Sequence, residues 1–356
     1  MYLFLSLCLC FELSLAGYNC TNDQICEIAD YSLRFFVLGD FGGQPVPPYH
    51  SFTQKRVAEA IGRMGEKLQT HFQVELGDNF YVVGPPNPYH FRFKKTFEEV
   101  YTHSDAMYKP WYILAGNHDH YGNVSAQIDY SRISERWVFP SLYYTFRYRF
   151  HQGRSVAEFV VIDTVVLCGN NKDLEFVGGW KALFTGSHQI STPRPDRLEE
   201  AELHWTWLER TLRASRADYL FVLGHFPLYS VGHEGPTPCL VERLQPLLHK
   251  YKVNAYMAGH DHNVQHLQVS KQNWTTNYIV SGAASRSSRS KANEDGVPED
   301  SLKFRYPSHF NPLGPIGFSY GAFVYGHLMP RIGRFSFYTG KQKHKYTFRL
   351  SSRLAR

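Results

Sequence analysis

Two short polar motifs combine metal-binding side chains with glycine. The first is Glu75-Leu-Gly-Asp-Asn-Phe-Tyr81, and the second is Gly116-Asn-His-Asp-His120. Each motif follows a short apolar run, residues 72–76 and 111–115, which predicts a buried strand that ends in a polar loop. Proteins of the α/β class commonly carry their chemistry at the carboxyl ends of such strands. Asp, Asn, Tyr and His together offer oxygen and nitrogen donors that suit iron, manganese or zinc.

The pattern of apolar strand, glycine and metal-binding residue occurs three more times, at Asp40, at His225, and at His260 with His262. An aspartate after glycine is usually part of a turn, and a lone histidine is usually an interior or surface group. Five such loops in one chain, however, supply the donors of a two-metal site. Glycine lets the backbone turn sharply close to the metals. His260 and His262 fall on the same side of an extended segment, so both can face the site.

These loops require a scaffold of alternating strands and helices. Strand, loop, helix and strand in succession predict βαβ units, and an aromatic content of 16% favours strands. Two polar segments, 169–195 and 284–300, are predicted to be exposed loops. No linker divides the chain, so we expect one α/β domain over residues 17–356. Strands are predicted at 33–38, 72–76, 111–115, 143–150, 157–164, 218–223, 253–258, 277–281, 318–327, 334–339 and 345–350, and helical segments at 53–68, 91–101, 197–214 and 239–251.

The first 16 residues are apolar and end in Ser14-Leu15-Ala16, which predicts a signal peptide. The segment lacks an initial Lys or Arg and contains Glu12, so a buried helix is the alternative. No later stretch reaches the roughly 20 apolar residues that span a bilayer. We therefore expect a protein of the secretory pathway without a membrane span.

Cysteines and glycosylation sequons fit the same route. Four cysteines remain after the predicted signal peptide, and of the three possible pairings we favour Cys20 with Cys26 and Cys168 with Cys239. Sequons of this kind are common by chance and support the route only weakly. They begin at Asn19, Asn123 and Asn273, and we expect glycosylation at Asn123 and Asn273.

The chain is mildly basic, with a formal charge of +6 and a pI near 8.8. Much of the excess lies in residues 341–345 and 349–356. We interpret these as a solvated terminal strand and tail rather than a surface for nucleic acid or membrane. A positive field would help to attract acidic, phosphorylated substrates.

The order of the five loops resembles the metallophosphoesterase superfamily, whose pattern is Asp, Gly-Asp-x-x-Tyr, Gly-Asn-His-Asp or Glu, His, and Gly-His-x-His. The resemblance is strongest to the purple acid phosphatases of the mammalian, tartrate-resistant type. It extends to residues 122–127, 167–169 and 235–240 and covers nearly the whole mature chain. Tyr81 discriminates within the superfamily, because most relatives lack a phenolate ligand. The implied fold is a four-layer αββα sandwich of two mixed sheets flanked by helices.

The resemblance implies an acid phosphatase with a binuclear Fe(III)–M(II) centre, in which M is Fe(II), or zinc or manganese in some relatives. A hard trivalent ion suits carboxylate and phenolate donors, whereas imidazole and amide donors suit a divalent ion. The implied ligands are Asp40, Tyr81 and His262 for Fe(III), Asn117, His225 and His260 for the second metal, and Asp78 as the bridge.

The mechanism that follows is hydrolysis of a phosphate monoester at acid pH by a metal-bound hydroxide. His118 would stabilise the phosphoryl oxygens or protonate the leaving group. The chain departs from the family at His233-Glu234, where mammalian enzymes have Glu-His; we expect His233 to be the second substrate-facing residue, with Glu234 as the alternative. Segment 169–195 covers the region of the family's cleavable repressive loop but is longer and different, so regulation by clipping is a hypothesis.

Two other functions stay open. One is a manganese or zinc phosphodiesterase or nucleotide pyrophosphatase of the same superfamily, against which Tyr81 argues. The other is an iron-carrying glycoprotein with little catalytic role. For the favoured phosphatase we expect a lysosomal or secreted monomer that acts on small phosphate monoesters or phosphoproteins.

Overall fold

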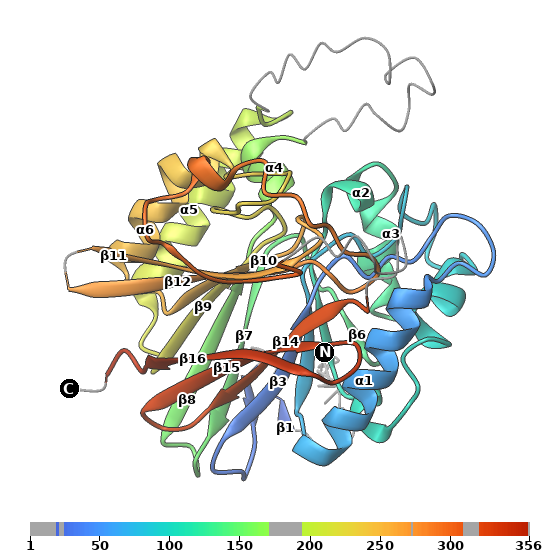
Figure 1. Ribbon diagram of the computed structural model, residues 1–356, viewed down its shortest axis with the longest axis horizontal. Coiled ribbons are helices and arrows are strands. Elements are labelled where there is room, and N and C mark those ends of the chain that lie inside the picture. Colours follow the sequence, from blue (N-terminus) through green and yellow to red (C-terminus); the bar gives the residue numbers. More distant parts are fainter. Residues whose placement is uncertain (1–18, 21–24, 171–193, 272, 309–319, 355–356) are drawn as a thin grey trace, which may run out of the picture.

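Two mixed β-sheets pack face to face, and helices cover their outer faces (Figure 1). The structure is a computed structural model that describes residues 19–20, 25–170, 194–271, 273–308 and 320–354. The predicted signal peptide and most of segment 169–195 lie outside the described residues, so the clipping hypothesis is not addressed. The arrangement is the predicted four-layer αββα sandwich.

The first sheet has seven strands in the order β16-β15-β14-β3-β4-β5-β6. Strands β3 to β6 are parallel to one another, and β14 to β16 are antiparallel. The strands are β3 (Leu33–Leu38), β4 (Phe72–Glu75), β5 (Trp111–Ile113), β6 (Trp137–Val138), β14 (Ala322–Leu328), β15 (Ile332–Thr339) and β16 (His344–Ser351). The helical segments between them are α1 (Phe52–Leu68), the π-helix η1 (Phe93–Glu98), the 3₁₀-helix η2 (Asp105–Tyr108), α2 (Asn117–His120) and α3 (Val124–Tyr130).

The second sheet has nine strands in the order β1-β2-β7-β8-β9-β10-β12-β11-β13, with β8, β9, β10 and β12 parallel. The strands are β1 (Asn19–Cys20), β2 (Ile25–Glu27), β7 (Tyr144–Phe150), β8 (Ser155–Val161), β9 (Tyr219–Leu223), β10 (Ala255–Ala258), β11 (Val264–Lys271), β12 (Trp274–Ser281) and β13 (Leu302–Tyr306). Its helical segments are α4 (Thr164–Cys168), α5 (Leu198–Ala214), the π-helix η4 (Leu240–Leu244), α6 (Gln245–Lys250) and the 3₁₀-helix η5 (Glu294–Gly296).

Helix α1 shows how local sequence sets an element. The Ser51 side chain caps its first turn by accepting a hydrogen bond from the Gln54 amide. Val57, Ile61 and Met64 lie on one face and are buried against the first sheet, as the helical spacing predicts.

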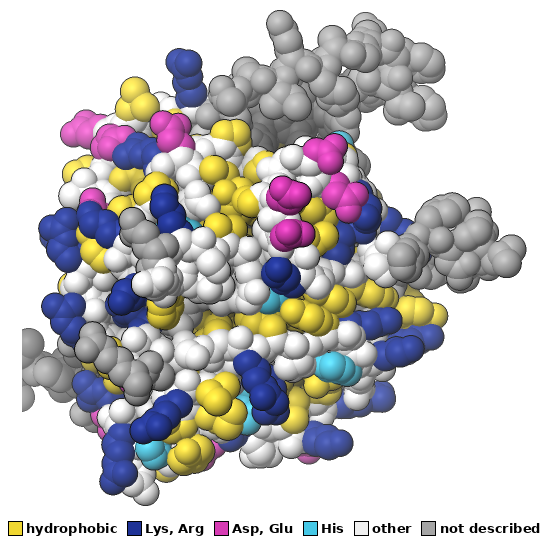
Figure 2. Space-filling view, turned by 60° about the vertical axis from the view of Figure 1, so that its left-hand side comes forward, with side chains coloured by type: hydrophobic (Ala, Val, Ile, Leu, Met, Phe, Trp, Pro, Cys, Tyr) yellow, Lys and Arg dark blue, Asp and Glu magenta, His cyan; other side chains and the backbone are white. Residues whose placement is uncertain are grey.

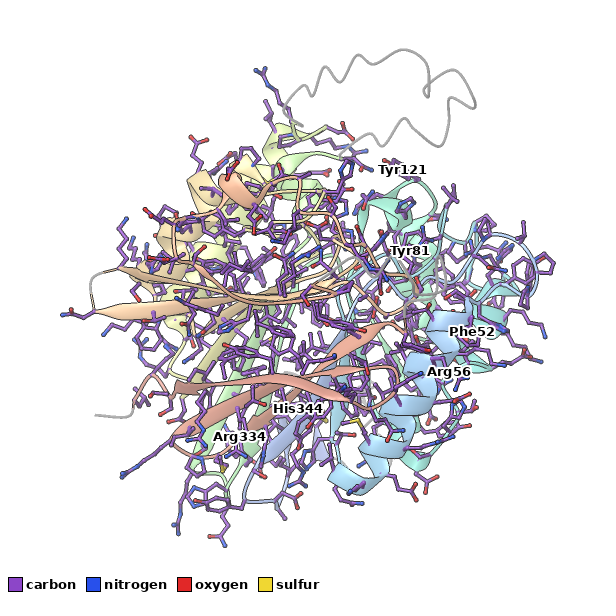
Figure 3. All side chains as sticks on the ribbon, in the orientation of Figure 1. Phe52, Arg56, Tyr81, Tyr121, Arg334 and His344 are labelled. Atoms are coloured by element: carbon purple, nitrogen blue, oxygen red, sulfur yellow. A yellow bond between two sulfur atoms is a disulfide. The ribbon has the colours of Figure 1, made fainter. Side chains whose placement is uncertain are left out.

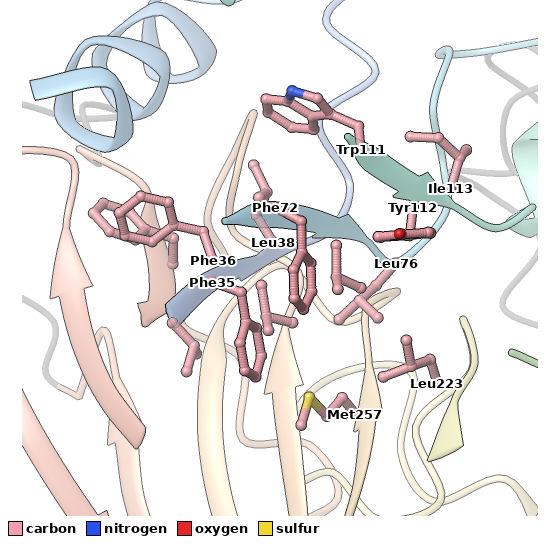
Figure 4. Close-up of a cluster of buried hydrophobic side chains, with 14 of the residues drawn as sticks. Phe35, Phe36, Leu38, Phe72, Leu76, Trp111, Tyr112, Ile113, Leu223 and Met257 are labelled. Carbon is pink, nitrogen blue, oxygen red and sulfur yellow. The ribbon is translucent and has the colours of Figure 1, made fainter. Parts of the chain in front are cut away.

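An aromatic core fixes the two sheets relative to each other. The Phe35 and Phe72 rings stack at 4.9 Å, and each meets the Phe159 ring of the other sheet edge-on, at 5.4 and 5.5 Å. Figure 4 shows Phe35 and Phe72 pointing toward Leu223 and Met257, which belong to β9 and β10. Edge-to-face aromatic pairs each add about 1 kcal/mol beyond the burial of their area. This packing holds the carboxyl ends of the two parallel strand sets at one common edge.

Both favoured disulfides are present in the structure. Cys20 bonds to Cys26, and Cys168 bonds to Cys239. The second bond joins the end of α4 to the residue that caps η4. It closes a sequence separation of 71 residues, so it restricts the unfolded chain strongly.

Several elements differ from the sequence prediction. Strand β11 was not predicted, because Gln265 and His266 are polar yet fully buried, which hides the alternation that marks a strand. Strand β13 lies directly after the polar segment 284–300 and was also missed. The helix predicted over 239–251 is a π-helix followed by an α-helix that has Pro near its start.

Positively charged side chains are dispersed over the displayed surface. Figure 2 shows Lys and Arg side chains spread over the displayed face rather than gathered in one patch. Among the described helices, none is both long and apolar enough to cross a membrane.

Candidate metal centre

The predicted ligands all lie just beyond the carboxyl ends of central parallel strands. The first sheet supplies four of them and the second sheet three, so the centre lies where the two sheets meet. Asp40 follows β3, Asp78 and Tyr81 follow β4, Asn117 follows β5, His225 follows β9, and His260 and His262 follow β10.

Three of these side chains form a first group. The Tyr81 hydroxyl donates to Asp40 Oδ1 at 3.0 Å and lies 3.0 Å from His262 Nε2. His262 Nε2 is 3.5 Å from the same carboxylate oxygen. Figure 3 places Tyr81 near the strand ends. These are the residues predicted to hold the ferric ion.

The other side chains form a second group. His225 Nε2 lies 2.9 Å from Asn117 Oδ1 and 3.4 Å from Asp78 Oδ1. Possible ligand atoms of Asp78, His225 and His260 lie within 4.8 Å of one another. His225 Nδ1 is 2.8 Å from the Leu76 carbonyl and must donate its hydrogen to that oxygen. In the neutral ring Nε2 is then unprotonated, and its lone pair faces the site and is available to a metal ion. These are the residues predicted for the second metal and the bridge.

The charge states of the buried groups suit cation binding. Burial lowers the pKa of His225, so its imidazole is neutral and can donate a lone pair. Burial alone would raise the pKa of Asp78, but the histidines around it, led by His225, bring that pKa below its ordinary value. Burial, together with Asp40 and Asp78, raises the pKa of Tyr81 well above its usual range. A phenol placed beside two carboxylates therefore keeps its proton unless a cation takes its place.

Three ligands adopt a backbone conformation that is uncommon for residues other than glycine. Asp40, Asp78 and His260 have φ angles of 62°, 59° and 67°. Each follows a glycine at the end of a strand. Left-handed residues with side chains cost free energy and cluster at functional sites, where the surrounding structure enforces them. The fold is therefore strained at the positions that aim donors into the centre.

A buried network locks the two motif loops together. Asp119 Oδ2 accepts hydrogen bonds from the Gly116 amide at 2.8 Å and the Asn79 amide at 3.1 Å. Asp119 Oδ1 accepts from Gln127 Nε2 at 2.8 Å, and the Asn79 side chain donates to Gln127 Oε1 at 3.0 Å. No role was predicted for Asp119, although its place in the second motif was visible; its partners depend on the fold.

One ring nitrogen of His118 contacts a backbone carbonyl, and the other faces the predicted metal centre. Its Nδ1 is 2.7 Å from the Val82 carbonyl, so Nδ1 carries a proton. Its Nε2 lies 3.9 Å from Asp78 Oδ2, and the side chain is 17% exposed. The ring is therefore oriented, reachable by solvent and next to the predicted bridge.

The structure brings the Glu234 side chain, rather than that of His233, against a predicted ligand. Glu234 Oε2 lies 3.4 Å from His260 Nε2, whereas His233 is exposed. Burial would raise the pKa of Glu234, but His260, together with His233 and His262, outweighs burial and brings that pKa to about 2. The Glu234 amide donates to Asp261 Oδ1 at 3.3 Å, and Asn293 Nδ2 binds the His233 carbonyl at 2.9 Å. The substrate-facing role of His233 stays a prediction.

The predicted glycosylation sites are both exposed. Asn123 caps α3 by accepting from the Ala126 amide, and its Nδ2 donates to the Pro86 carbonyl. Asn273 lies between β11 and β12. Their modification stays a prediction.

Comparison with known proteins identifies the family to which the chain belongs. Residues 33–264 match the calcineurin-like phosphoesterase family. The chain belongs to that family and, within it, to the purple acid phosphatases of the tartrate-resistant type.

The individual relatives are similar over most of their length. Tartrate-resistant acid phosphatase type 5 of Oryctolagus cuniculus is 42% identical over 294 residues, which is 83% of this chain and 85% of the relative. The Homo sapiens protein of the same name is 42% identical over 83% of this chain and 86% of its own. Purple acid phosphatase 17 of Arabidopsis thaliana is 31% identical over 78% of this chain and 76% of its own.

Among solved structures, GAP50, the anchor in the inner membrane complex of Plasmodium, superposes with a TM-score of 0.70 at 23% identity. The match covers 90% of this chain and 89% of GAP50. At that identity it supports the fold alone.

Proposed function

We propose that the protein is an acid phosphatase that hydrolyses phosphate monoesters at a binuclear metal centre. The observation that carries this proposal is the meeting of the seven predicted ligands in two adjoining groups. One group contains two oxygen donors and one imidazole, Asp40, Tyr81 and His262. The other contains Asn117, His225 and His260, with Asp78 among them.

The residues fit the metals that the family implies. The buried phenol of Tyr81 contacts a carboxylate, an arrangement that favours a strongly charged cation in place of the phenolic proton. Asp40, Tyr81 and His262 would therefore hold Fe(III), and Asn117, His225 and His260 would hold Fe(II), zinc or manganese. Asp78 would contact both ions.

The metal ions would supply Lewis acidity and an acidified water as the nucleophile. The chain orients the reaction around them. His118 is fixed through its Nδ1–H by the Val82 carbonyl. In the imidazolium form its Nε2–H can therefore donate to a phosphoryl oxygen or protonate the leaving oxygen. The Asp119 network holds the loops that carry Asp78 and His118 at a constant separation.

We further propose a lysosomal or secreted monomer. Two disulfides are typical of proteins that fold in an oxidising compartment.

Tyr81, in contact with Asp40 and His262, favours an iron phosphatase over a manganese or zinc phosphodiesterase. The placement of His118 favours catalysis over iron carriage.

The purified protein is expected to be coloured by charge transfer from Tyr81 to Fe(III), to contain two metal ions, and to hydrolyse aryl phosphates best at acid pH. Visible absorption, elemental analysis and a pH–rate profile measure these properties. A colourless, iron-free protein with full activity would refute the proposal. A coloured protein without hydrolysis of any ester would favour the iron carrier.

Replacing His118 by alanine is expected to lower kcat for aryl phosphates by about 10²- to 10⁴-fold, because general acid–base catalysis contributes factors of this size. Metal content and the visible spectrum should not change, since the predicted ligands are intact. The matched control is His103→Ala, which removes an exposed histidine. Equal kcat values for the wild type and His118→Ala would exclude His118 from the reaction.

A further inference from the structure

The segment after β12 is fastened to the backbone of the predicted iron ligands. The Ser285 hydroxyl donates to the Asp40 carbonyl at 2.5 Å, and the Ser288 amide donates to the His262 carbonyl at 2.5 Å. The Ala284 amide also donates to the Gly39 carbonyl at 3.2 Å. The start of this segment, which the sequence predicts as an exposed loop, is therefore a wall of the metal centre.

Between the two fastened serines, Arg286 reaches over the predicted iron ligand Tyr81. Its guanidinium carbon lies 3.9 Å from the centre of the Tyr81 ring. Arg286 is exposed, and among the residues that the structure describes no hydrogen bond or ion pair engages its guanidinium. The donors of this side chain are thus free and adjacent to the centre.

Another arginine near Tyr81 has a different role. Arg92 is buried, and its guanidinium donates to the backbone carbonyls of Val83, at 2.9 Å, and of Tyr81. Its donors hold the loop that carries Tyr81. Of these two arginines, Arg286 is the one that can bind a ligand from solvent.

The chemistry of an arginine stacked on an aromatic ring suits a phosphoryl group. A guanidinium over a ring face keeps its N–H donors, which point outward in its own plane. Two of those donors match two oxygens of a phosphate. On the side of His260 the site carries the Glu234 carboxylate, which cannot attract a phosphate dianion. A positively charged side chain elsewhere at the site would offset the repulsion between the Glu234 carboxylate and the phosphate.

We propose that Arg286 binds the non-bridging oxygens of the phosphoryl group, with the Tyr81 ring as its platform. The inference rests on the proposed function, and it names a residue that adds to the affinity of the metal centre for phosphate monoesters and for inorganic phosphate.

The test measures the binding of inorganic phosphate to the metal-loaded protein by calorimetry, and KM and kcat for an aryl phosphate. Arg286→Gln is expected to weaken phosphate binding about ten- to hundredfold, the value of a charge-assisted hydrogen bond. Arg286→Lys keeps the positive charge but lacks the paired N–H donors of the guanidinium. Its affinity for phosphate should lie between those of the wild type and Arg286→Gln. Elemental analysis should show the same metal content in all variants.

The matched control is Arg289→Gln. Arg289 is an exposed arginine of the same segment, and its charge lies near Tyr306, where it partly offsets the rise in pKa that burial causes. It should bind phosphate as the wild type does. Arg286→Gln protein that keeps its metals and binds phosphate as tightly as the wild type would overturn the inference. Loss of metal together with phosphate affinity would also overturn it, because Arg286 would then support the centre instead of binding the ligand.

The failures of the two proposals are distinguishable. A wild-type protein that binds inorganic phosphate but hydrolyses no ester would refute the proposed function. The comparison of phosphate affinities between the wild type, Arg286→Gln and Arg289→Gln would still decide the role of Arg286.

Discussion

Replacing Asp78 by asparagine is expected to abolish both metal retention and hydrolysis of phosphate esters. Asparagine keeps the shape of the side chain and removes its negative charge. Asp78 Oδ1 accepts from the His118 amide at 3.0 Å and lies 3.4 Å from His225 Nε2, so the carboxylate is surrounded by groups that favour an anion. Two cations that share this one carboxylate would both lose a charged ligand. We expect kcat/KM to fall by at least about 10³-fold.

Elemental analysis and visible absorption of the purified Asp78→Asn protein measure metal retention, and aryl-phosphate hydrolysis measures turnover. The control is Asp295→Asn, the same substitution at an exposed carboxylate. It should keep both metals and full activity. If Asp78→Asn protein retains two metals and turns over normally, Asp78 is not a bridging ligand.

Replacing Gly116 by alanine is expected to disable the centre without changing any ligand. A Cβ atom at residue 116 would overlap Asp78 Oδ1 and the Asp78 amide and lie 2.8 Å from His225 Cε1. Asp78 and His225 are buried, so one of them must move. A displacement of about 1 Å can cost about 10²-fold in rate, and overpacking costs about 1–3 kcal/mol of unfolding free energy.

The measurements are kcat/KM, metal content and thermal stability of Gly116→Ala. Gly153→Ala is the control, because its Cβ would meet nothing within 4 Å and only its φ of 76° is unfavourable for alanine. It should lose about 1–2 kcal/mol of stability and keep its activity. Normal activity of Gly116→Ala would show that Asp78 and His225 can shift without harm.

Much of the scaffold was readable from local pattern. Strand β3 was predicted with its observed bounds, and α1 within one residue of its start, because short apolar runs and helical spacing mark buried strands and amphipathic helices. The glycine that ends each strand marked the loops that meet at the centre. Both favoured disulfides are present as well.

Other features depend on contacts between distant segments. A helical segment was predicted over 91–101, and the structure has η1 there, but no local pattern reveals that it is a π-helix. The buried polar strand β11 likewise has no periodicity that reveals it. The partners of Asp119 include Asn79 in the loop after β4 and Gln127 in α3. The choice between His233 and Glu234 depends on where His260 lies. In the sequence, Arg286 is one of several charged residues in a predicted exposed loop, and no role was predicted for it.

The amino-acid sequence by itself determined the donor types, the glycines beside them and the strands that deliver them, because residue chemistry and spacing are local properties. Only the tertiary structure decided that Glu234 faces His260 and that Arg286 lies over Tyr81. The physical reason is that these pairs join residues far apart in the chain, and their separations are set by the packing of two sheets through the core of Phe35, Phe72 and Phe159.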